Sequence, residues 1–574
     1  MLSLCVESAS AQRKENARVM GLVELYGLSA SIVHGDEDQL AANLLLEFLR
    51  PNLRELKTVP AKGSKNRDDD VVLYLGSFDK NLPAAKAFKS FGYSLNWDAL
   101  SEGSFLLKTF RKGGKTTIFV AGKDRQGTLY AAQELKNYYL RTDMGRVLLN
   151  ELSISERAQL KYRWFRLTDR DTESRVKRAI ADTAPAGSSG QPSDPAQLKA
   201  VVDYLSTLRL NGLLLRSFPG VGSTGVAAVQ DLCAYAAERA VRILPRIGLN
   251  GCDGPHSDGD RTLNLDSWAK AHRDLCAVGR NGSIRDGMLC PEKPENRQRY
   301  REGLQWLFQT ARVGGVSIEL EPFFVCYSED CKKARLAMGG ADPDYSKDLA
   351  RFVGFLAEEI LKLDPSAWVA YLSGTGFDYE SIQASAARAL PPGQRAAFPP
   401  EFVHRIPESA VAEWELAPML KSGVWPSPFR APGKHGLGVL QWGGSAAKEI
   451  YWKRTESITH HAIASNLEGL VISGGGRSDN PFSELNDLVF AELAFNPAVN
   501  FDELFRFKVS RLYGGEEAAR RLSKILALLE DEKGMLVANY DEALRLARQA
   551  AEVSERSGKE RWAQLVELIQ SLKR

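Results

Sequence analysis

Short apolar runs recur through the middle of the chain, and amphipathic segments of helical length separate them. Apolar runs of this length, bounded by turn residues, are typical of buried strands. Eight of them are predicted as strands: Tyr162–Thr168, Gly212–Ser217, Val241–Gly248, Gly315–Glu321, Trp368–Ser373, Ala410–Leu416, Leu437–Trp442 and Gly469–Ser473. Eight strands that alternate with helices are what a closed parallel barrel requires. The pattern predicts the α/β fold class, with a (β/α)8 TIM barrel over residues 156–498.

The two ends of the chain follow other patterns. Residues 17–155 predict a small α/β domain that precedes the barrel. Its predicted elements are strands at Val19–Leu25, Val71–Gly76, Ser104–Lys108, Thr116–Ala121 and Arg146–Ser153, and helices at Asp38–Leu49 and Thr128–Leu140. From Phe501 onward, apolar residues recur every three or four positions, which predicts C-terminal helices over residues 499–574 with Asp502 as a cap.

The composition of the chain limits the kinds of molecule that it is expected to bind. The 574 residues exceed what one hydrophobic core usually holds, in agreement with several domains. With 44% hydrophobic residues, 26% charged residues and a formal net charge of +3, the chain has no electrostatic bias toward nucleic acid or a membrane surface. No apolar run approaches the roughly 18 residues of a membrane span. We therefore expect neither nucleic acid nor membrane as a partner, and the sequence does not indicate an oligomeric state.

The N-terminal residues bear on localisation. Residues 1–16 lack the basic segment and long apolar run of a complete signal peptide, but Ala9-Ser10-Ala11 has the small-x-small form of a cleavage site. Two interpretations stay open. Either these residues are the remnant of a signal peptide and the protein is secreted or periplasmic, or they are an ordinary disordered start of a cytoplasmic protein.

Seven cysteines are present, and six of them lie between Cys233 and Cys331. An even, clustered set is compatible with disulfides in an oxidising compartment and equally with buried thiols in the cytosol. Cys326 and Cys331 are spaced too widely for a CxxC pair, and no nearby histidine completes a zinc site. The sequence therefore predicts no metal site and no cofactor, and it contains no nucleotide-binding, zincin or serine-hydrolase motif in a supporting context.

Paired carboxylates mark the predicted fourth strand. Glu319 and Glu321 are two residues apart, so they point to the same face of a strand otherwise suited to burial. Active sites of parallel barrels form at the carboxyl ends of the strands, and Glu321 lies at such an end. Glycoside cleavage requires an acid that protonates the leaving oxygen. Glu321 is our candidate general acid. Glu319, about 7 Å deeper at two residues of strand rise, is a supporting catalytic candidate or part of an acid layer paired with arginines.

The predicted sixth and seventh strands supply further candidates. Glu413-Trp414-Glu415 repeats the spacing of the fourth strand, and strands four and six contribute to shared layers of a barrel. Glu415 is thus a candidate partner of Glu321. Trp414 and Trp442 are candidate substrate-binding residues because an aromatic ring can stack on the apolar face of a sugar. The alternative for each of them is core packing.

Several segments resemble one superfamily of glycoside hydrolases: family 20 and family 84 hexosaminidases and family 67 α-glucuronidases. The segments are Val120–Leu135, Tyr162–Asp169, Leu205–Leu215, Leu467–Ile472, Ser483–Asn486 and Phe495–Pro497. The resemblance covers roughly residues 70 to 520. It implies a hexosaminidase-like N-terminal domain before the barrel, and it implies that Arg166 and Asp169 bind sugar.

The sequence departs from the pattern of these families at the acid pair of the fourth strand. Family 20 enzymes carry adjacent Asp and Glu at the end of the fourth strand, and family 84 enzymes carry two adjacent Asp residues, whereas one residue separates Glu319 from Glu321 here. Two functions stay open. The first is a glycosidase, hexosaminidase-like or α-glucuronidase-like, that cleaves terminal sugars from an oligosaccharide or glycoside. The second is a barrel that binds glycans without cleaving them.

Overall fold

The structure is a computed structural model of the whole chain. It describes residues 22–63, 69–93, 96–97, 100–143, 146–167, 195–215, 221–250, 263–319, 324–337, 345–372, 410–415, 436–441, 452–464, 467–473, 482–529 and 539–573. The predicted signal-peptide remnant at residues 1–16 lies outside these ranges.

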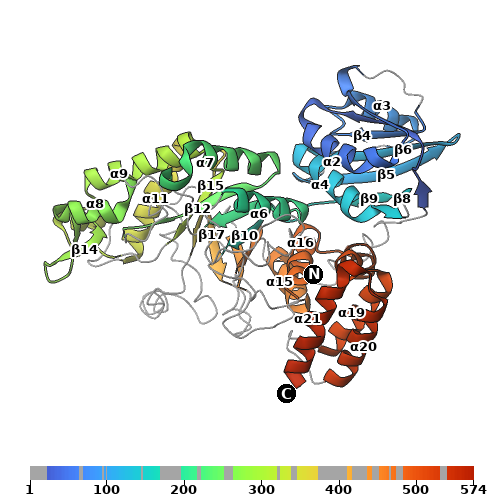
Figure 1. Cartoon of the computed structure of the whole chain (residues 1–574). Helices are drawn as coiled ribbons and strands as arrows, with labels where there is room; N and C mark the ends of the chain where they lie inside the picture. The colour runs from blue at the N-terminus through green and yellow to red at the C-terminus, as the bar shows by residue number, and fades with distance from the viewer. Residues whose placement is uncertain are drawn as a thin grey trace.

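The centre of the molecule is a closed barrel of eight parallel strands (Figure 1). In order around the barrel, they are β10 (Tyr162–Leu167), β11 (Gly212–Leu215), β12 (Arg242–Gly248), β15 (Gly315–Glu319), β16 (Trp368–Leu372), β17 (Ala410–Glu415), β18 (Gly436–Gln441) and β19 (Gly469–Ser473). The first strand, β10, pairs with both β11 and β19, which closes the sheet. The mixed α/β class and the positions of all eight strands are confirmed, each end to within two residues.

Aromatic rings fill the amino-terminal half of the barrel interior. Trp164 of β10 stacks on Trp368 of β16 with ring centroids 5.8 Å apart, and Tyr162 meets Trp368 edge-on. Glycine leaves room for them, because a Cβ on Gly212 would lie 2.4 Å from the Trp164 ring. This half of the barrel is therefore a packed core, and only its carboxyl-terminal half is available for a site.

Helices cover the outside of the barrel and bury the outward-facing residues of its strands. Those that the structure describes around the barrel are α6 (Pro195–Thr207), α7 (Val221–Glu238), α8 (Leu265–Ala271), α9 (Pro294–Gln305), η9 (Trp306–Ala311), α10 (Glu329–Leu336), α11 (Tyr345–Leu363), α15 (Trp452–Ala464) and α16 (Ser483–Phe495). Between α8 and α9 lies a hairpin of β13 (Cys276–Val278) and β14 (Ile284–Leu289), which the apolar pattern did not reveal. Only Leu289 of its second strand is buried, so that strand shows no apolar alternation.

A six-stranded sheet precedes the barrel, in the order β3-β2-β4-β6-β5-β9. The elements of this region are β1 (Leu22–Glu24), β2 (Ser29–His34), α2 (Gln39–Leu49), β3 (Glu55–Pro60), β4 (Val71–Leu75), α3 (Leu82–Ser90), β5 (Phe105–Lys112), β6 (Lys115–Gly122), α4 (Arg125–Glu134), η5 (Leu135–Tyr139), β7 (Leu140–Asp143), β8 (Arg146–Asn150) and β9 (Ser153–Glu156). The sequence missed β2 and β3. Because β3 is the edge strand and exposes most of its residues, it carries no apolar alternation.

The C-terminal region is helical, as predicted from its spacing of apolar residues. Its elements are α17 (Phe501–Glu503), η10 (Leu504–Val509), α18 (Ser510–Tyr513), α19 (Glu516–Leu529), α20 (Tyr540–Val553) and α21 (Arg556–Lys573). The predicted cap, Asp502, is wrong by two residues: the side chain of Asn500 accepts hydrogen bonds from the N–H groups of Asp502 and Glu503. Among the residues described, no helix has the length and apolarity that crossing a membrane requires.

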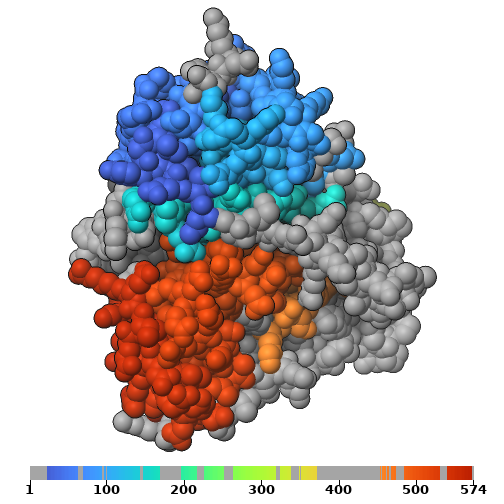
Figure 2. All heavy atoms as spheres, turned by 90° about the vertical axis from the view of Figure 1, so that its right-hand side faces the viewer, coloured from blue at the N-terminus to red at the C-terminus, as the bar shows by residue number. Residues whose placement is uncertain are grey.

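A buried ion cluster joins these three parts at the amino-terminal end of the barrel. Arg209 precedes β11 and pairs with Glu492 of α16 and with Glu134 of α4. Lys508 of η10 pairs with the same two carboxylates, at 2.8 Å from Glu492. Figure 2 shows the N-terminal region, blue to cyan, above the C-terminal helices, orange to red, on the face where these parts meet. We call Glu134, Arg209, Glu492 and Lys508 the junction cluster.

Candidate functional site

Polar side chains occupy the barrel interior just beyond the aromatic core. Along β10, Trp164 faces inward and Phe165 packs outward, so Arg166 belongs to the inward set. The same alternation assigns Arg246 of β12 and Ser317 of β15 to that set. All three are buried, with exposed fractions of 7% for Arg166, 9% for Arg246 and 0% for Ser317. Two cationic groups inside a barrel favour anionic or strongly hydrogen-bonding neighbours.

The candidate acids lie at this carboxyl-terminal end at matching heights. Strand register pairs Glu319 of β15 with Leu372 of β16, and Leu372 with Glu413 of β17. Positions 319 and 413 therefore occupy one level on strands that are two apart, which is about 10 Å at the usual strand spacing. Glu321 follows Glu319 by two residues along the chain, as Glu415 follows Glu413. The two strands thus bring positions 319 and 413, each the first residue of a Glu-x-Glu sequence, to one level of the barrel.

The chain is anchored on both sides of the segment that contains Glu321. Before it, Gly248 of β12 pairs with Glu319 at the end of β15. After it, the side-chain amide of Asn250 donates to the Phe324 carbonyl at 2.8 Å and accepts from the Phe324 N–H at 3.0 Å. β12 and Asn250 thus hold the described chain at Glu319 and at Phe324.

The predicted site residues fall into three groups. The structure places the Arg166 side chain inside the barrel, at the level just below the acids. It describes the backbone positions of Glu319 at the end of β15 and of Trp414 and Glu415 at the end of β17. The remaining residues lie outside the described ranges: Asp169, Glu321 and Trp442. The catalytic and sugar-binding roles of all seven stay predictions.

Sequence reasoning missed Arg246 and Ser317. Arg246 is a charged residue in the apolar strand Arg242–Gly248, two positions after the inward-facing Leu244. Ser317 is paired with Arg246 in the strand register. The alternation of β12 was a sufficient signal for Arg246. Nothing in the sequence reveals that Arg246 lies beside the strand that carries the candidate acids, because this neighbourhood depends on strand order.

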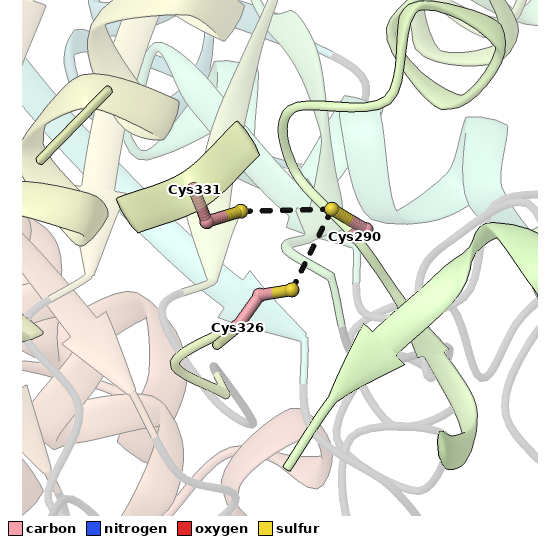
Figure 3. A group of neighbouring side chains, drawn as sticks. All are labelled: Cys290, Cys326 and Cys331. Carbon is pink, nitrogen blue, oxygen red and sulfur yellow. Dashed lines mark hydrogen bonds between the residues drawn. The ribbon is translucent and has the colours of Figure 1, made fainter. Parts of the chain in front are cut away.

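Three cysteines form a separate cluster outside the barrel (Figure 3). The Cys290 sulfur lies 3.5 Å from the sulfurs of both Cys326 and Cys331, and all three sulfurs lie within 4.8 Å of one another. No disulfide joins any of the five cysteines that the structure describes. In the sequence, the spacing of Cys326 and Cys331 argued against a metal site. The third cysteine of the cluster, Cys290, comes from another segment of the chain.

Comparison with solved structures supports the fold. CpGH84B matches at a TM-score of 0.56 with 11% identity, over 97% of this chain and 88% of its own. CpGH84D matches at 0.56 with 12% identity, over 97% and 87%. The β-N-acetylhexosaminidase from Bacteroides fragilis NCTC 9343 matches at 0.52 with 13% identity, over 91% and 95%. These structural neighbours are glycoside hydrolases, and at such identities the likeness shows the fold alone.

Sequence-level comparisons find no relative. No family model matches the chain, and no curated protein does. The function must therefore be argued from the site.

Proposed function

We propose that this protein is a glycoside hydrolase that removes terminal sugars by carboxylate acid-base chemistry. In this proposal residues 156–498 are the catalytic domain, flanked by a hexosaminidase-like domain at 17–155 and a helical region at 499–574. The substrate is a hexosaminide or an α-glucuronide. Secretion or export to the periplasm is part of the same proposal.

The observation that carries the proposal is the pair of Glu-x-Glu strand ends. The fold likeness to glycoside hydrolases supports a site at the carboxyl ends of the strands, where parallel barrels carry their active sites. In this barrel β15 and β17 reach that end at one level, about 10 Å apart. Glycosidases hold two carboxyl groups about 5 to 9.5 Å apart, the shorter separation for retention and the longer for inversion. Side chains from two strands at this spacing can span that range.

The residues have distinct roles. Glu321 is the general acid, because in the sequence it follows the carboxyl end of β15, the end at which parallel barrels carry their catalytic groups. Glu415 is the second carboxylate. Glu319 is a positioning residue. It follows Ser317 by two residues along β15, and Ser317 pairs with Arg246 in the strand register. Arg166 and Asp169, together with Trp442, bind the sugar ring through charge and stacking. Trp414 alternates with Glu415 along β17, so the assignment of Glu415 to the site gives Trp414 the alternative role of core packing.

A panel of chromogenic glycosides tests the proposal. We expect the full chain to release nitrophenol from β-N-acetylglucosaminide, β-N-acetylgalactosaminide or α-glucuronide substrates, and to do so without an added cofactor. Exo-action predicts that capping the terminal sugar abolishes release. No turnover of any substrate, together with measurable sugar binding by calorimetry, would instead support a glycan-binding barrel, for which the separated acids are the sequence argument.

A further inference from the structure

The cysteine cluster brings together three segments that are distant in the chain. Cys290 follows β14, Cys326 lies in the loop after β15, and Cys331 lies in the first turn of α10. All three are fully buried, beside Ala277 and partly buried Val278 and Met288. In Figure 3 the three sulfurs point toward a common centre. Among the described residues, no histidine or carboxylate belongs to this group.

The sulfur separations fit ligands of one metal ion better than a disulfide. A disulfide requires about 2.05 Å between its sulfurs, whereas Cys290 is 3.5 Å from each of its neighbours. Zinc binds thiolates at about 2.3 Å, so two thiolates of a tetrahedral site lie about 3.8 Å apart. A disulfide would also use only two of the three sulfurs. We propose that Cys290, Cys326 and Cys331 bind a zinc ion, with a fourth position for a non-protein donor such as water.

The surroundings are those of thiolate ligands. The backbone N–H groups of Val278 and Ser328 donate to the Cys326 sulfur at 3.4 and 3.5 Å. Hydrogen bonds to the ligating atoms orient them and stabilise their charge. Ser328 caps α10 by accepting from the Cys331 N–H at 3.3 Å, which places Cys331 in the first turn, where the helix dipole favours a thiolate.

A neighbouring ion pair holds the loop from its other side. Arg335 of α10 donates to the Cys326 carbonyl and to both carboxylate oxygens of Asp348 in α11, at 3.1 and 3.0 Å. Both partners are buried. The cluster thus links the β13–β14 hairpin to Cys326 and to the start of α10. In the sequence, Cys326 follows the candidate acid Glu321 by five residues.

Metal uptake by the full chain tests this site without reference to enzyme activity. The reduced protein, stripped by a chelator, is titrated with Zn²⁺ and, separately, with Co²⁺. We expect one equivalent of zinc and a thiolate-to-cobalt charge-transfer absorption. Zinc affinity should fall at least about tenfold in Cys290→Ser and Cys331→Ser. Cys276→Ser is the matched control, because Cys276 is also buried in this hairpin but lies outside the cluster. It should bind zinc as the unaltered chain does.

Further readouts separate zinc from the alternatives. Hydrogen exchange across residues 324–337 should speed up when zinc is removed and slow again when it is restored. Absence of the charge-transfer absorption in the unaltered chain would overturn the proposal, even if the variants fail to fold. A disulfide between any two of the three cysteines, found by mass spectrometry of protein alkylated without reduction, would overturn it as well. Loss of glycosidase activity alone would say nothing about zinc.

Discussion

The two ends of the barrel both bury charge, and they do so in opposite ways. At the amino-terminal end, Arg209 is 2% exposed and is enclosed by Glu134 and Glu492, which arrive from separate helices. At the carboxyl-terminal end, Arg166 and Arg246 lie inside the barrel beneath the glutamate-bearing ends of β15 and β17. At the first end, oppositely charged side chains from separate parts of the chain pair with one another. At the second, buried arginines lie near the strands that carry candidate catalytic acids.

Electrostatics explain why the junction cluster is structural. Burial disfavours the charge of Arg209, but Glu492 and Glu134 raise its pKa. Burial likewise opposes ionisation of Glu492, yet Arg209 and Lys508 hold its pKa below the ordinary value. Arg209 and Glu492 therefore stabilise each other's charged form. Arg209 also adopts a left-handed backbone with φ of 61°, which costs energy for a residue with a side chain. A structural role at this end and a functional role at the other are typical of parallel barrels.

The largest expected effect belongs to the carboxyl-terminal end. Glu321→Gln removes the proposed proton donor, so kcat/KM should fall about 100- to 10,000-fold with no change in thermal unfolding. Steady-state kinetics on the best substrate of the panel measures the fall. Glu329→Gln, an exposed carboxylate in the first turn of α10, is the control and should retain activity. Unchanged turnover in Glu321→Gln would remove Glu321 as the acid.

The amino-terminal end should respond in the reverse manner. Arg209→Met leaves Glu134 and Glu492 buried with one cation fewer, so the free energy of unfolding should fall by about 3 to 5 kcal/mol. Turnover per folded molecule should not change. Urea unfolding measures the loss, and Arg520→Met, at a side chain that is 71% exposed, should shift stability by less than about 0.5 kcal/mol. Equal stability of the two variants would contradict the assignment.

Arg166→Met places the same substitution at the other end of the barrel. If Arg166 binds sugar, KM should rise about tenfold, since a hydrogen bond to a charged group contributes about 1.5 to 3 kcal/mol. Its loss of stability should be smaller than that of Arg209→Met. Steady-state kinetics and urea unfolding, measured for both variants, compare their KM values and their free energies of unfolding. A large loss of stability with unchanged KM would show that Arg166 is also structural.

The smallest effect concerns pH at the junction. Glu503 lines a small cavity there with Glu156 and Lys508, and burial, followed by repulsion from Glu156, raises its pKa to about 7. The folded state thus holds this proton more tightly than the unfolded chain does. Its contribution to stability is complete below the unfolded pKa of about 4.5 and is lost as pH rises through about 7.

Glu503→Gln isolates that contribution. Between about pH 5 and about pH 8, the unaltered chain should lose about 1 kcal/mol of stability relative to this variant, a value reduced because Glu503 is partly exposed. Urea unfolding at both pH values measures the difference. Glu517→Gln, on the exposed face of α19, should show no such difference. A gain in relative stability with rising pH would contradict the raised pKa.

Much of the architecture was predictable because it depends on local pattern. Buried parallel strands need continuous apolar residues, so all eight were found from the sequence, and Glu-x-Glu identified two strand ends. Strands with few buried residues were harder to predict. The edge strand β3 has no buried residue and the hairpin strand β14 has one, so neither shows an apolar alternation, whereas β2 was missed although it is buried.

By itself, the sequence determined the strands, their alternation and the acids at their ends, since each follows from the residues of one segment. Only the tertiary structure decided which segments meet. Arg209 gains its partners from α4 and α16, and Cys290 lies beside Cys326 and Cys331, which come from another part of the chain. Contacts between segments far apart in the chain depend on strand order and helix packing. No periodicity within a segment encodes them.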